Sequence, residues 1–291
     1  EIKKAIVDLI FRYKDVFDEK PRKAKIEPVK IQVTSKEPIR SKTYTVPFNL
    51  RQPMREKIQQ WLIWGVIIEK ESPFVNPIHC VVKGNSIRPV LDARNINEII
   101  ISNNVQVEPI HEILRRMSGA TVFSIWDLKD AYYSISLDEE SIPLTSFLFE
   151  GRQYCFTRLI MGFKSSCSIF QSVMNNLFDL STKSYLAVYL DDIICFSPNI
   201  ESHFVHLSKV FAKLEDKNFS VNFFKCKFFQ KEIECLGHVV NGSFIRISPN
   251  SNEAIRNFPI PKTRRQVKRL LGIANWRRKH IRNFAEITEP L

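Results

Sequence analysis

The sequence predicts an α+β fold in which antiparallel sheets and helices follow one another in no regular order. Apolar runs rich in β-branched and aromatic residues come in pairs joined by short polar turns, which is typical of hairpins. Stretches with a helical repeat of apolar residues separate these pairs irregularly, which argues against a doubly wound parallel sheet. With 291 residues, 44% of them hydrophobic, the chain is long enough for a large core or for two to three subdomains.

Residues 1–45 are expected to form a lead-in, with a short amphipathic helix followed by a stretch bearing Lys and Pro. A helix is predicted from about Pro53 to Trp64, because Gly65 suits a C-terminal stop. The next elements show either strand-like apolar runs or helical periodicity. In chain order they are a hairpin at 78–91, a short helix carrying Ile113, Leu114 and Met117, a strand ending at Asp127, a hairpin around Gly151-Arg152, a helix at 165–178, a hairpin at 187–197, a helix at 201–217 and strands from Leu236 to Ile247.

Two helices are predicted at the C-terminus. Ser248-Pro249 offers a cap and a first-turn proline to one helix, and Thr263 to Gln266 forms a capping box for the other. The basic residues of this region have no acidic residue among them: Lys262, Arg264, Arg265, Lys268, Arg269, Arg277, Arg278, Lys279 and Arg282. Opposite them lies a predicted apolar stripe of Val267, Leu270, Leu271 and Ala274. This face suits the phosphate backbone of a nucleic-acid duplex, whereas an ordinary solvated helix would carry mixed charges.

Asp191 and Asp192 are adjacent carboxylates at the turn between two apolar runs that we expect to be buried strands. Such a pair alone often does no more than cap a solvated hairpin. Asp127, however, ends another strand-like run, and a strand placed beside the hairpin would bring three carboxylates to one sheet edge. The charges there need a cation to offset desolvation and repulsion. Carboxylate oxygens suit Mg²⁺, and two such ions about 3.5–4 Å apart promote nucleotidyl transfer.

Seven collinear blocks of the chain resemble the reverse transcriptase domain of gypsy-class long-terminal-repeat retrotransposons, which is part of a retrovirus-like pol polyprotein. The blocks are Ser72-Pro73 to Pro77, Ile87 to Asn97, Phe123 to Leu137, Met161 to Lys164 with Phe170-Gln171, Tyr189 to Asp192, Phe223 to Phe229 with Leu236 to His238, and Leu270 to Gly272 with Asn275-Trp276. The resemblance implies a right-hand polymerase fold with fingers, thumb and a palm whose antiparallel sheet packs on helices. It places the fingers at 46–106 and 135–165, the palm at 107–134 and 166–243, and the thumb at 244–291.

The resemblance also implies an RNA-directed DNA polymerase that adds deoxynucleotides to a primer 3′-hydroxyl with two Mg²⁺ ions, or with Mn²⁺ in their place. Asp127, Asp191 and Asp192 would be catalytic and would bind the metals together with the Leu128 backbone. The implied nucleotide-binding residues are Lys83, Arg88, Asp130, Ala131, Tyr132, Met161 and Gly162. The implied primer and template contacts are Tyr189, Leu190, Leu236, Gly237, His238, Arg264, Arg265, Lys268 and Arg269.

Several of these roles have plainer alternatives. Lys83 and Arg88 could be solvated hairpin charges, and Tyr132 could be a core tyrosine instead of a steric gate against a ribose 2′-hydroxyl. The hairpin that carries Lys83 is one residue shorter than is usual in the family and lacks the customary lysine run. Other departures from the family put efficiency and nucleotide fit in question. They are Ile160-Met161 for Pro-Phe, Ser165-Ser166-Cys167 for Asn-Ala-Pro, Ala93 for Tyr and Trp126 for Leu.

Composition narrows the class of protein. A net charge of +12 and a pI near 9.4 indicate a polyanionic partner, most simply nucleic acid. The six cysteines form no C-x-x-C pair, so we expect reduced core thiols in an intracellular protein. His203 and His206 are expected beside or outside the apolar stripe of their helix and not at a metal. The first residues lack the charged-then-apolar layout of a signal peptide, and the sequence contains no membrane-length apolar run and no phosphate-binding glycine loop.

The expected partners are an RNA or DNA template–primer duplex and deoxynucleoside triphosphates, with no membrane. The chain does not begin with Met and stops near where family members continue, so we expect a piece of a polyprotein that lacks RNase H activity itself, with RNase H and integrase adjacent. We expect an intracellular place, in a cytoplasmic virus-like particle and in the nucleus as a further location, and the oligomeric state is left open. A catalytically silent, domesticated relative that binds nucleic acid or protein is the alternative. An RNA-templated RNA polymerase is a third reading, against which Tyr132 argues.

Overall fold

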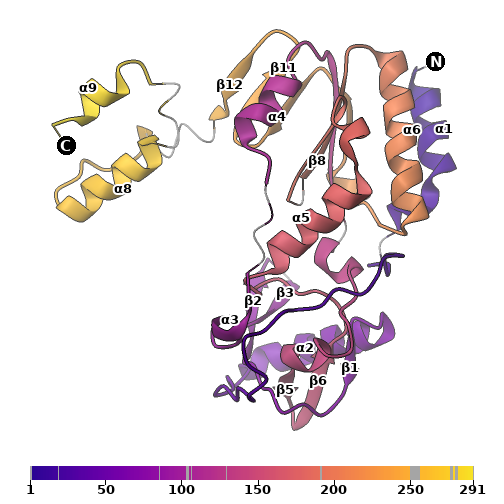
Figure 1. The fold of residues 1–291 in the computed structure, drawn as a ribbon, viewed down its shortest axis with the longest axis vertical. Helices are drawn as coiled ribbons and strands as arrows, with labels where there is room; N and C mark the ends of the chain where they lie inside the picture. The colour runs from indigo at the N-terminus through magenta and orange to yellow at the C-terminus, as the bar shows by residue number, and fades with distance from the viewer. Residues whose placement is uncertain are drawn as a thin grey trace.

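The computed structural model describes residues 2–18, 20–84, 86–102, 105, 107–128, 130–190, 192–249, 256–275, 278 and 281–290. Within these residues the strands form four sheets, and every pair of neighbouring strands is antiparallel. Helices and sheets are mixed along the chain, as Figure 1 shows. The predicted α+β class is therefore observed.

A four-stranded sheet positions the aspartates. Its order is β7 (Leu186–Tyr189), β8 (Asp192–Ser197), β4 (Val122–Asp127) and β9 (Lys227–Gln230). Helix α6 (Ile200–Asp216) packs on this sheet through a buried stripe that includes Leu207, Phe211 and Leu214. Helix α5 (Ser166–Leu177) lies against β7, and α1 (Ile2–Arg12) runs beside α6 (Figure 1).

A three-stranded sheet of β10 (Glu232–Cys235), β11 (His238–Asn241) and β12 (Ile245–Ile247) lies next to α4 (Ile110–Arg116). Buried side chains of α4, β10 and β11 share a small core with the four-stranded sheet, and they include Ile113, Leu114, Ile233, Val240 and Ile194. Burial of these aliphatic groups packs the three-stranded sheet and α4 against the four-stranded sheet.

The other end of the molecule carries two smaller sheets (Figure 1). One is the hairpin of β2 (Ile78–Lys83) and β3 (Ser86–Leu91), and the other has the order β1 (Ile67–Glu69), β6 (Arg152–Phe156) and β5 (Phe147–Phe149). The helices of this end are α2 (Phe48–Ile63) and α3 (Ile96–Ile99). Short 3₁₀ helices connect the elements along the chain: η1 (Lys14–Phe17), η2 (Ala131–Ser134), η3 (Ile142–Thr145), η4 (Leu180–Thr182) and η5 (Phe223–Lys225).

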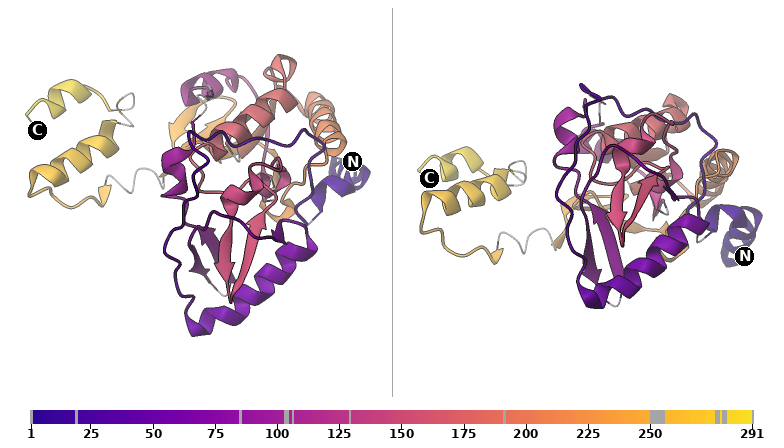
Figure 2. Two further views of the ribbon diagram at one scale, coloured as in Figure 1. Left: turned by 60° about the horizontal axis from the view of Figure 1, so that its bottom comes forward. Right: turned by 90° about the horizontal axis from the view of Figure 1, so that it is seen from below.

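The lead-in joins the two ends. Its predicted N-terminal helix is α1, and after η1 the chain runs extended along the outside of the molecule (Figure 2). Single β-bridges link it first to Leu137, then to Ile100 and finally to Val75. Residues 24–41 therefore form a strap across both halves of the molecule.

Helices α8 (Arg264–Asn275) and α9 (Phe284–Thr288) stand apart from the four sheets in all three views (Figures 1 and 2). The predicted capping box is present, because the Gln266 side chain accepts from the Thr263 backbone N–H at 3.1 Å and the Gln266 N–H donates to Thr263 Oγ1 at 3.3 Å. The helix predicted to open at Ser248-Pro249 falls largely on residues 250–255, outside the described residues. Among the residues described, no helix is long and apolar enough to cross a membrane.

Two predictions about helices were wrong. Helix α2 begins at Phe48, so Pro53 lies inside it and is not its first residue. The chain turns into the helix at Pro47, which has an extended conformation and accepts from the Leu50 N–H at 2.9 Å. His203 and His206 were expected beside or outside the buried stripe of α6, yet His203 is fully buried within it, whereas His206 is partly buried. The buried His203 ring is hydrogen-bonded by Ser124 of β4 and Ser197 of β8.

The cysteines follow the prediction with one exception. Cys155, Cys195 and Cys235 are buried, and all six cysteines, which fall within the described ranges, are free thiols. Burial raises the pKa of Cys155 to about 11, because it disfavours the thiolate. Cys167 is exposed on the first turn of α5 and is not a core residue.

Candidate active site

Asp127 and Asp192 face each other across the central pair of strands. The register of β4 and β8 places these two residues directly opposite, at the last position of β4 and the first of β8. Residues paired in this way have Cβ atoms about 4.5–5.5 Å apart. Asp191 lies outside the described residues, but it precedes Asp192 in the chain. The structure therefore brings together the two predicted aspartates that it describes.

The turn between β7 and β8 is held from the side by Gln171. Tyr189 pairs with Asp192, so two residues make the turn, and Leu190 takes a left-handed conformation with φ of 53°. The Leu190 N–H donates to Gln171 Oε1 at 3.1 Å, and Gln171 Nε2 reaches the Val188 carbonyl at 3.4 Å. Gln171 is buried on α5, so its amide fixes the turn that presents Asp192. The sequence predicted no role for this residue, although it belongs to one of the matching blocks.

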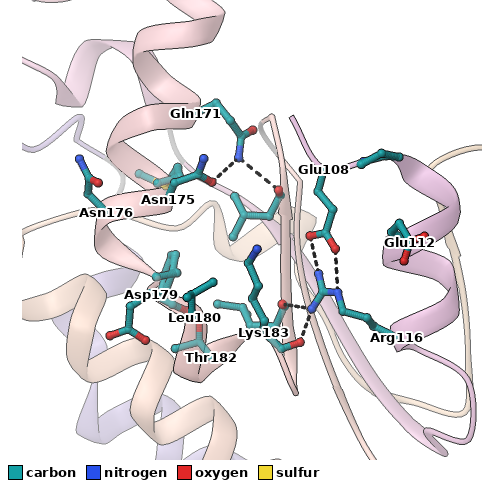
Figure 3. Close-up of a pocket in the computed structure, with 15 residues that line it drawn as sticks. Glu108, Glu112, Arg116, Gln171, Asn175, Asn176, Asp179, Leu180, Thr182 and Lys183 are labelled. Atoms are coloured by element: carbon teal, nitrogen blue, oxygen red, sulfur yellow. Dashed lines mark hydrogen bonds and ion pairs between the residues drawn. The ribbon is translucent and has the colours of Figure 1, made fainter. Parts of the chain in front are cut away.

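Gln171 also borders a cavity of about 710 Å³ between α4, the C-terminal half of α5, residues 178–183 and β7 (Figure 3). In it, Arg116 forms an ion pair with Glu108 at 2.8 Å and donates to the Leu186 carbonyl at 3.0 Å. Asn175 accepts from Gln171 at 3.0 Å. These contacts tie α4 and α5 to β7, and so they support the strand that leads into the turn.

A second cavity, of about 750 Å³, opens beside Asp127. Seven of the predicted site residues line it: Arg88, Asp127, Leu128, Asp130, Ala131, Tyr132 and Met161. They come from β3, from the end of β4 with the residues after it, and from the loop before α5. Residues distant in the sequence thus meet in one space large enough for a nucleotide.

Tyr132 forms a fixed wall of this cavity. Its side chain is buried, its ring lies 5.2 Å from the ring of Phe170, and its hydroxyl lies 3.4 Å from Cys167 Sγ. The preceding Asp130 has a left-handed backbone with φ of 44°, which turns the chain from β4 into η2. Tyr132 therefore has the burial and packing of a core tyrosine, and it also lines the Asp127 cavity.

Arg88 and Met161 meet across the cavity, where Arg88 Nη2 contacts Met161 Sδ. The loop that carries Met161 is fixed by Asn97, which donates to the Gly162 carbonyl at 2.8 Å and accepts from the Lys164 N–H at 2.8 Å. Gly162 has φ of 106°, and a Cβ there would lie 3.5 Å from the Leu91 carbonyl. Gly162 is therefore needed for its backbone conformation. The Lys83 side chain lies outside what the structure describes.

Lys225 is a residue of the site that the sequence did not predict. Its Nζ lies 2.6 Å from Asp127 Oδ2, and it lines the same cavity from η5. The Asn222 N–H donates to the Asp127 carbonyl at 3.0 Å, which holds η5 beside the end of β4. Asp127 thus already has a cationic neighbour, which partly offsets the repulsion between the facing carboxylates.

The predicted primer hairpin lies near Asp192. Leu236 and Gly237 form a two-residue turn between β10 and β11, with φ of 51° and 74°. Burial, followed by the charges of Asp192 and Glu234, raises the pKa of Cys235 to about 12. Leu236 of this turn and Tyr189, which pairs with Asp192, pack against the same small hydrophobic core. His238 Nδ1 lies 2.9 Å from the Leu236 carbonyl.

The predicted basic face is solvent-exposed on α8, and none of its described residues lines the Asp127 cavity. Arg264, Arg265, Lys268 and Arg269 are exposed, and so are Lys262, Arg278 and Arg282. Val267, Leu270, Leu271 and Ala274 are half-buried, as a stripe on one side of the helix requires. Arg277 and Lys279 lie outside the described residues. The structure does not place this face against the aspartates.

The facing aspartates and the cavity beside them lie in the part of the chain that matches a known protein family. That family is the reverse transcriptase (RNA-dependent DNA polymerase) family, and the match covers residues 70–240. The chain belongs to the reverse transcriptase family. The matched span contains the two facing aspartates and all the residues that line the Asp127 cavity apart from Lys57 and Trp61. The resemblance predicted from the seven blocks is confirmed.

Relatives of this reverse transcriptase domain include two proteins of Drosophila melanogaster. The chain is 33% identical over 90% of its length to the retrovirus-related Pol polyprotein from transposon 297, and 31% identical over its whole length to that from transposon gypsy. It is also 27% identical over 98% of its length to the Schizosaccharomyces pombe transposon Tf2-3 polyprotein. The chain spans only 25%, 29% and 22% of these three relatives.

Among solved structures, the foamy viral protease–reverse transcriptase is similar over 99% of this reverse transcriptase domain. The form in complex with double-stranded DNA has a TM-score of 0.90 at 26% identity, and the chain covers 51% of it. The form in complex with an RNA/DNA hybrid has a TM-score of 0.85, with 39% of that chain covered. The right-hand polymerase fold is thus confirmed, while the boundaries of fingers, palm and thumb remain predictions.

Proposed function

We propose that this chain is an RNA-directed DNA polymerase that adds deoxynucleotides to a primer 3′-hydroxyl on an RNA or DNA template. The observation that carries the proposal is the register of β4 and β8, which sets Asp127 opposite Asp192 beside a cavity of about 750 Å³. Membership of the reverse transcriptase family supports the same reaction and implies dependence on a divalent metal.

The residues at the end of β4 fit such a metal. The facing carboxylates of Asp127 and Asp192 and the Leu128 carbonyl are oxygen donors, which Mg²⁺ prefers. Asp127 is partly exposed and already attracts the Lys225 ammonium. We assign Asp127, Asp191, Asp192 and the Leu128 carbonyl to two Mg²⁺ ions. When bound, the ions would activate the primer hydroxyl and stabilise the leaving pyrophosphate.

The remaining residues would bind and select the nucleotide. Arg88 would contact the triphosphate as a cation of the cavity rim. The Tyr132 ring is fixed by Phe170, so it would exclude a ribose 2′-hydroxyl by steric clash. The exposed basic face of α8 would follow the duplex backbone without reading sequence. The RNA/DNA hybrid and double-stranded DNA bound by the foamy viral relatives support this choice of partner.

Primer extension on a defined RNA template with Mg²⁺ tests the proposal. The wild-type chain should extend the primer, and Asp192→Asn should reduce extension by at least about 10²-fold while leaving duplex affinity within about threefold, because it removes a carboxylate charge without changing shape. Wild-type protein that binds the duplex but is as inert as the variant would reject the polymerase and support a silent nucleic-acid-binding relative. Equal incorporation of ribonucleotides would instead support an RNA polymerase.

A further inference from the structure

The aromatic side chain of Phe224 is exposed beside the Asp127 cavity. Phe224 is the middle residue of η5, and the residues that line the cavity from this segment, Asn222 and Lys225, lie on either side of it in the chain. Its side chain is 84% exposed, whereas Tyr132 of the cavity wall is buried. Single exposed apolar side chains are common on proteins, so the notable feature of Phe224 is its position.

A row of aromatic rings leads from the core to Phe224. Its ring centroid lies 6.0 Å from that of Phe223, and the Phe223 ring lies 5.6 Å from Phe17. Phe17 lies 6.3 Å from Phe228 of β9, which in turn lies 6.2 Å from the buried Trp126 of β4. The row thus starts in the four-stranded sheet and ends at the surface. Phe224 is its outermost ring, supported from one side and open to solvent on the rest.

An exposed ring beside a nucleotide-sized cavity suits a nucleobase. Every base has a flat π-face, so stacking on an aromatic side chain tolerates all four bases. A polymerase must admit four nucleotides by one route, whereas hydrogen bonds to base edges would distinguish them. The Phe224 side chain has no hydrogen-bonding atom and therefore makes no such distinction.

The charge around Phe224 suits the phosphates of the same nucleotide. Between Asp216 and Glu232 the chain carries four lysines and no acidic residue, which favours the approach of a polyanion. Lys225 follows Phe224 directly, and neighbouring Cα atoms are only about 3.8 Å apart. A base on the ring would therefore leave its phosphates close to the cavity that Lys225 and Arg88 line.

We propose that Phe224 stacks the base of an incoming deoxynucleoside triphosphate before the nucleotide moves into the Asp127 cavity. The proposal rests on the polymerase function proposed above and adds a first nucleotide contact outside the cavity. Stacking there would raise the local concentration of all four nucleotides without choosing among them.

Binding of 2-aminopurine deoxyriboside triphosphate to the full chain, without primer or template, tests the proposal. Stacking should quench the fluorescence of the base, and the titration gives the dissociation constant. Phe224→Leu keeps an apolar side chain but removes the ring, so it should weaken binding about tenfold, whereas Phe224→Tyr should stay within about threefold. Phe48→Leu is the matched control and should bind as the wild type does, because Phe48 is 86% exposed on α2 and does not line the cavity.

Inorganic tripolyphosphate separates the base from the phosphates. It lacks a base, so its dissociation constant, measured by calorimetry, should be the same for Phe224→Leu and the wild type. An equal loss of tripolyphosphate and nucleotide affinity would overturn the proposal, and so would unchanged nucleotide affinity in Phe224→Leu. Because Phe224 is exposed, its variants should keep the wild-type melting temperature. A lower melting temperature in Phe224→Leu would indicate a structural role instead.

Extension kinetics provide the second readout. Phe224→Leu should raise KM about equally for the four deoxynucleotides and leave kcat and the dissociation constant of the template–primer unchanged. Weaker duplex binding, or a rise in KM confined to one base, would contradict a stacking site for incoming nucleotides. Ring-dependent nucleotide binding by a chain that fails to extend primers would support Phe224 while rejecting the polymerase.

Discussion

Acid is expected to weaken the sheet that carries the aspartates, because His203 of α6 is buried against its two central strands, β4 and β8. His203 Nε2 lies 2.7 Å from Ser124 Oγ on β4, and Nδ1 lies 2.8 Å from Ser197 Oγ on β8. Burial, and next the neighbouring His206, lower the pKa of His203 to about 4. The neutral ring thus links the strands that end at Asp127 and begin at Asp192.

The size of the effect follows from the two protonation equilibria. The unfolded histidine titrates near pH 6.5, so between pH 6.5 and 4 the unfolded state binds more protons than the folded state. Well above pH 6.5, His203 is neutral in both states, so its protonation does not affect the free energy of unfolding. The free energy of unfolding falls as the pH drops from 6.5 to 4. At about 1.36 kcal/mol per pKa unit, the upper limit is about 3.4 kcal/mol, and about 2 kcal/mol is already lost at pH 5.

Urea unfolding at several pH values between 7.5 and 4.5 measures this loss. His203→Gln lacks the titrating group, so its free energy of unfolding should fall less steeply with acid than that of the wild type, by about 2 kcal/mol at pH 5. His111→Gln is the control, because the His111 side chain is 61% exposed on α4. If His203→Gln and the wild type lose stability in parallel, the argument from burial is refuted.

Three further predictions concern the site. Gln171→Ala should lower the single-turnover extension rate by about 5- to 150-fold, since an unsatisfied Leu190 N–H costs about 1–3 kcal/mol, whereas Asn175→Ala should keep the rate because it leaves that bond intact. Lys225→Met should lower the Mg²⁺ concentration for half-maximal extension, because the ammonium competes for Asp127; a higher requirement would contradict this. Arg265→Gln should reduce the slope of log duplex affinity against log salt by about 0.9 if the side chain contacts a phosphate, and an unchanged slope would exclude that contact.

Local patterns in the sequence were sufficient for most elements of the fold. The hairpin at 78–91 became β2 and β3, and the helix predicted at 201–217 became α6 at 200–216, because alternation and helical periodicity report directly on which face is buried. The capping box at Thr263 to Gln266 is equally local. The first and last residues of the elements were predicted less accurately than the elements themselves. The start of α2 depended on Pro47 and not on Pro53, and proline is compatible with more than one position near a helix start.

What the sequence determined by itself was the set of chemical groups: three aspartates at strand ends, a basic face and the motifs of a polymerase. Which groups meet was decided by the tertiary structure. Lys225 lies 98 residues from the aspartate it pairs with, His203 finds hydroxyls on two different strands, and Lys57 reaches the cavity from α2. The physical reason is that periodicity encodes which side of an element is buried but not the partner across the interface, because partners depend on the packing of elements distant in the chain.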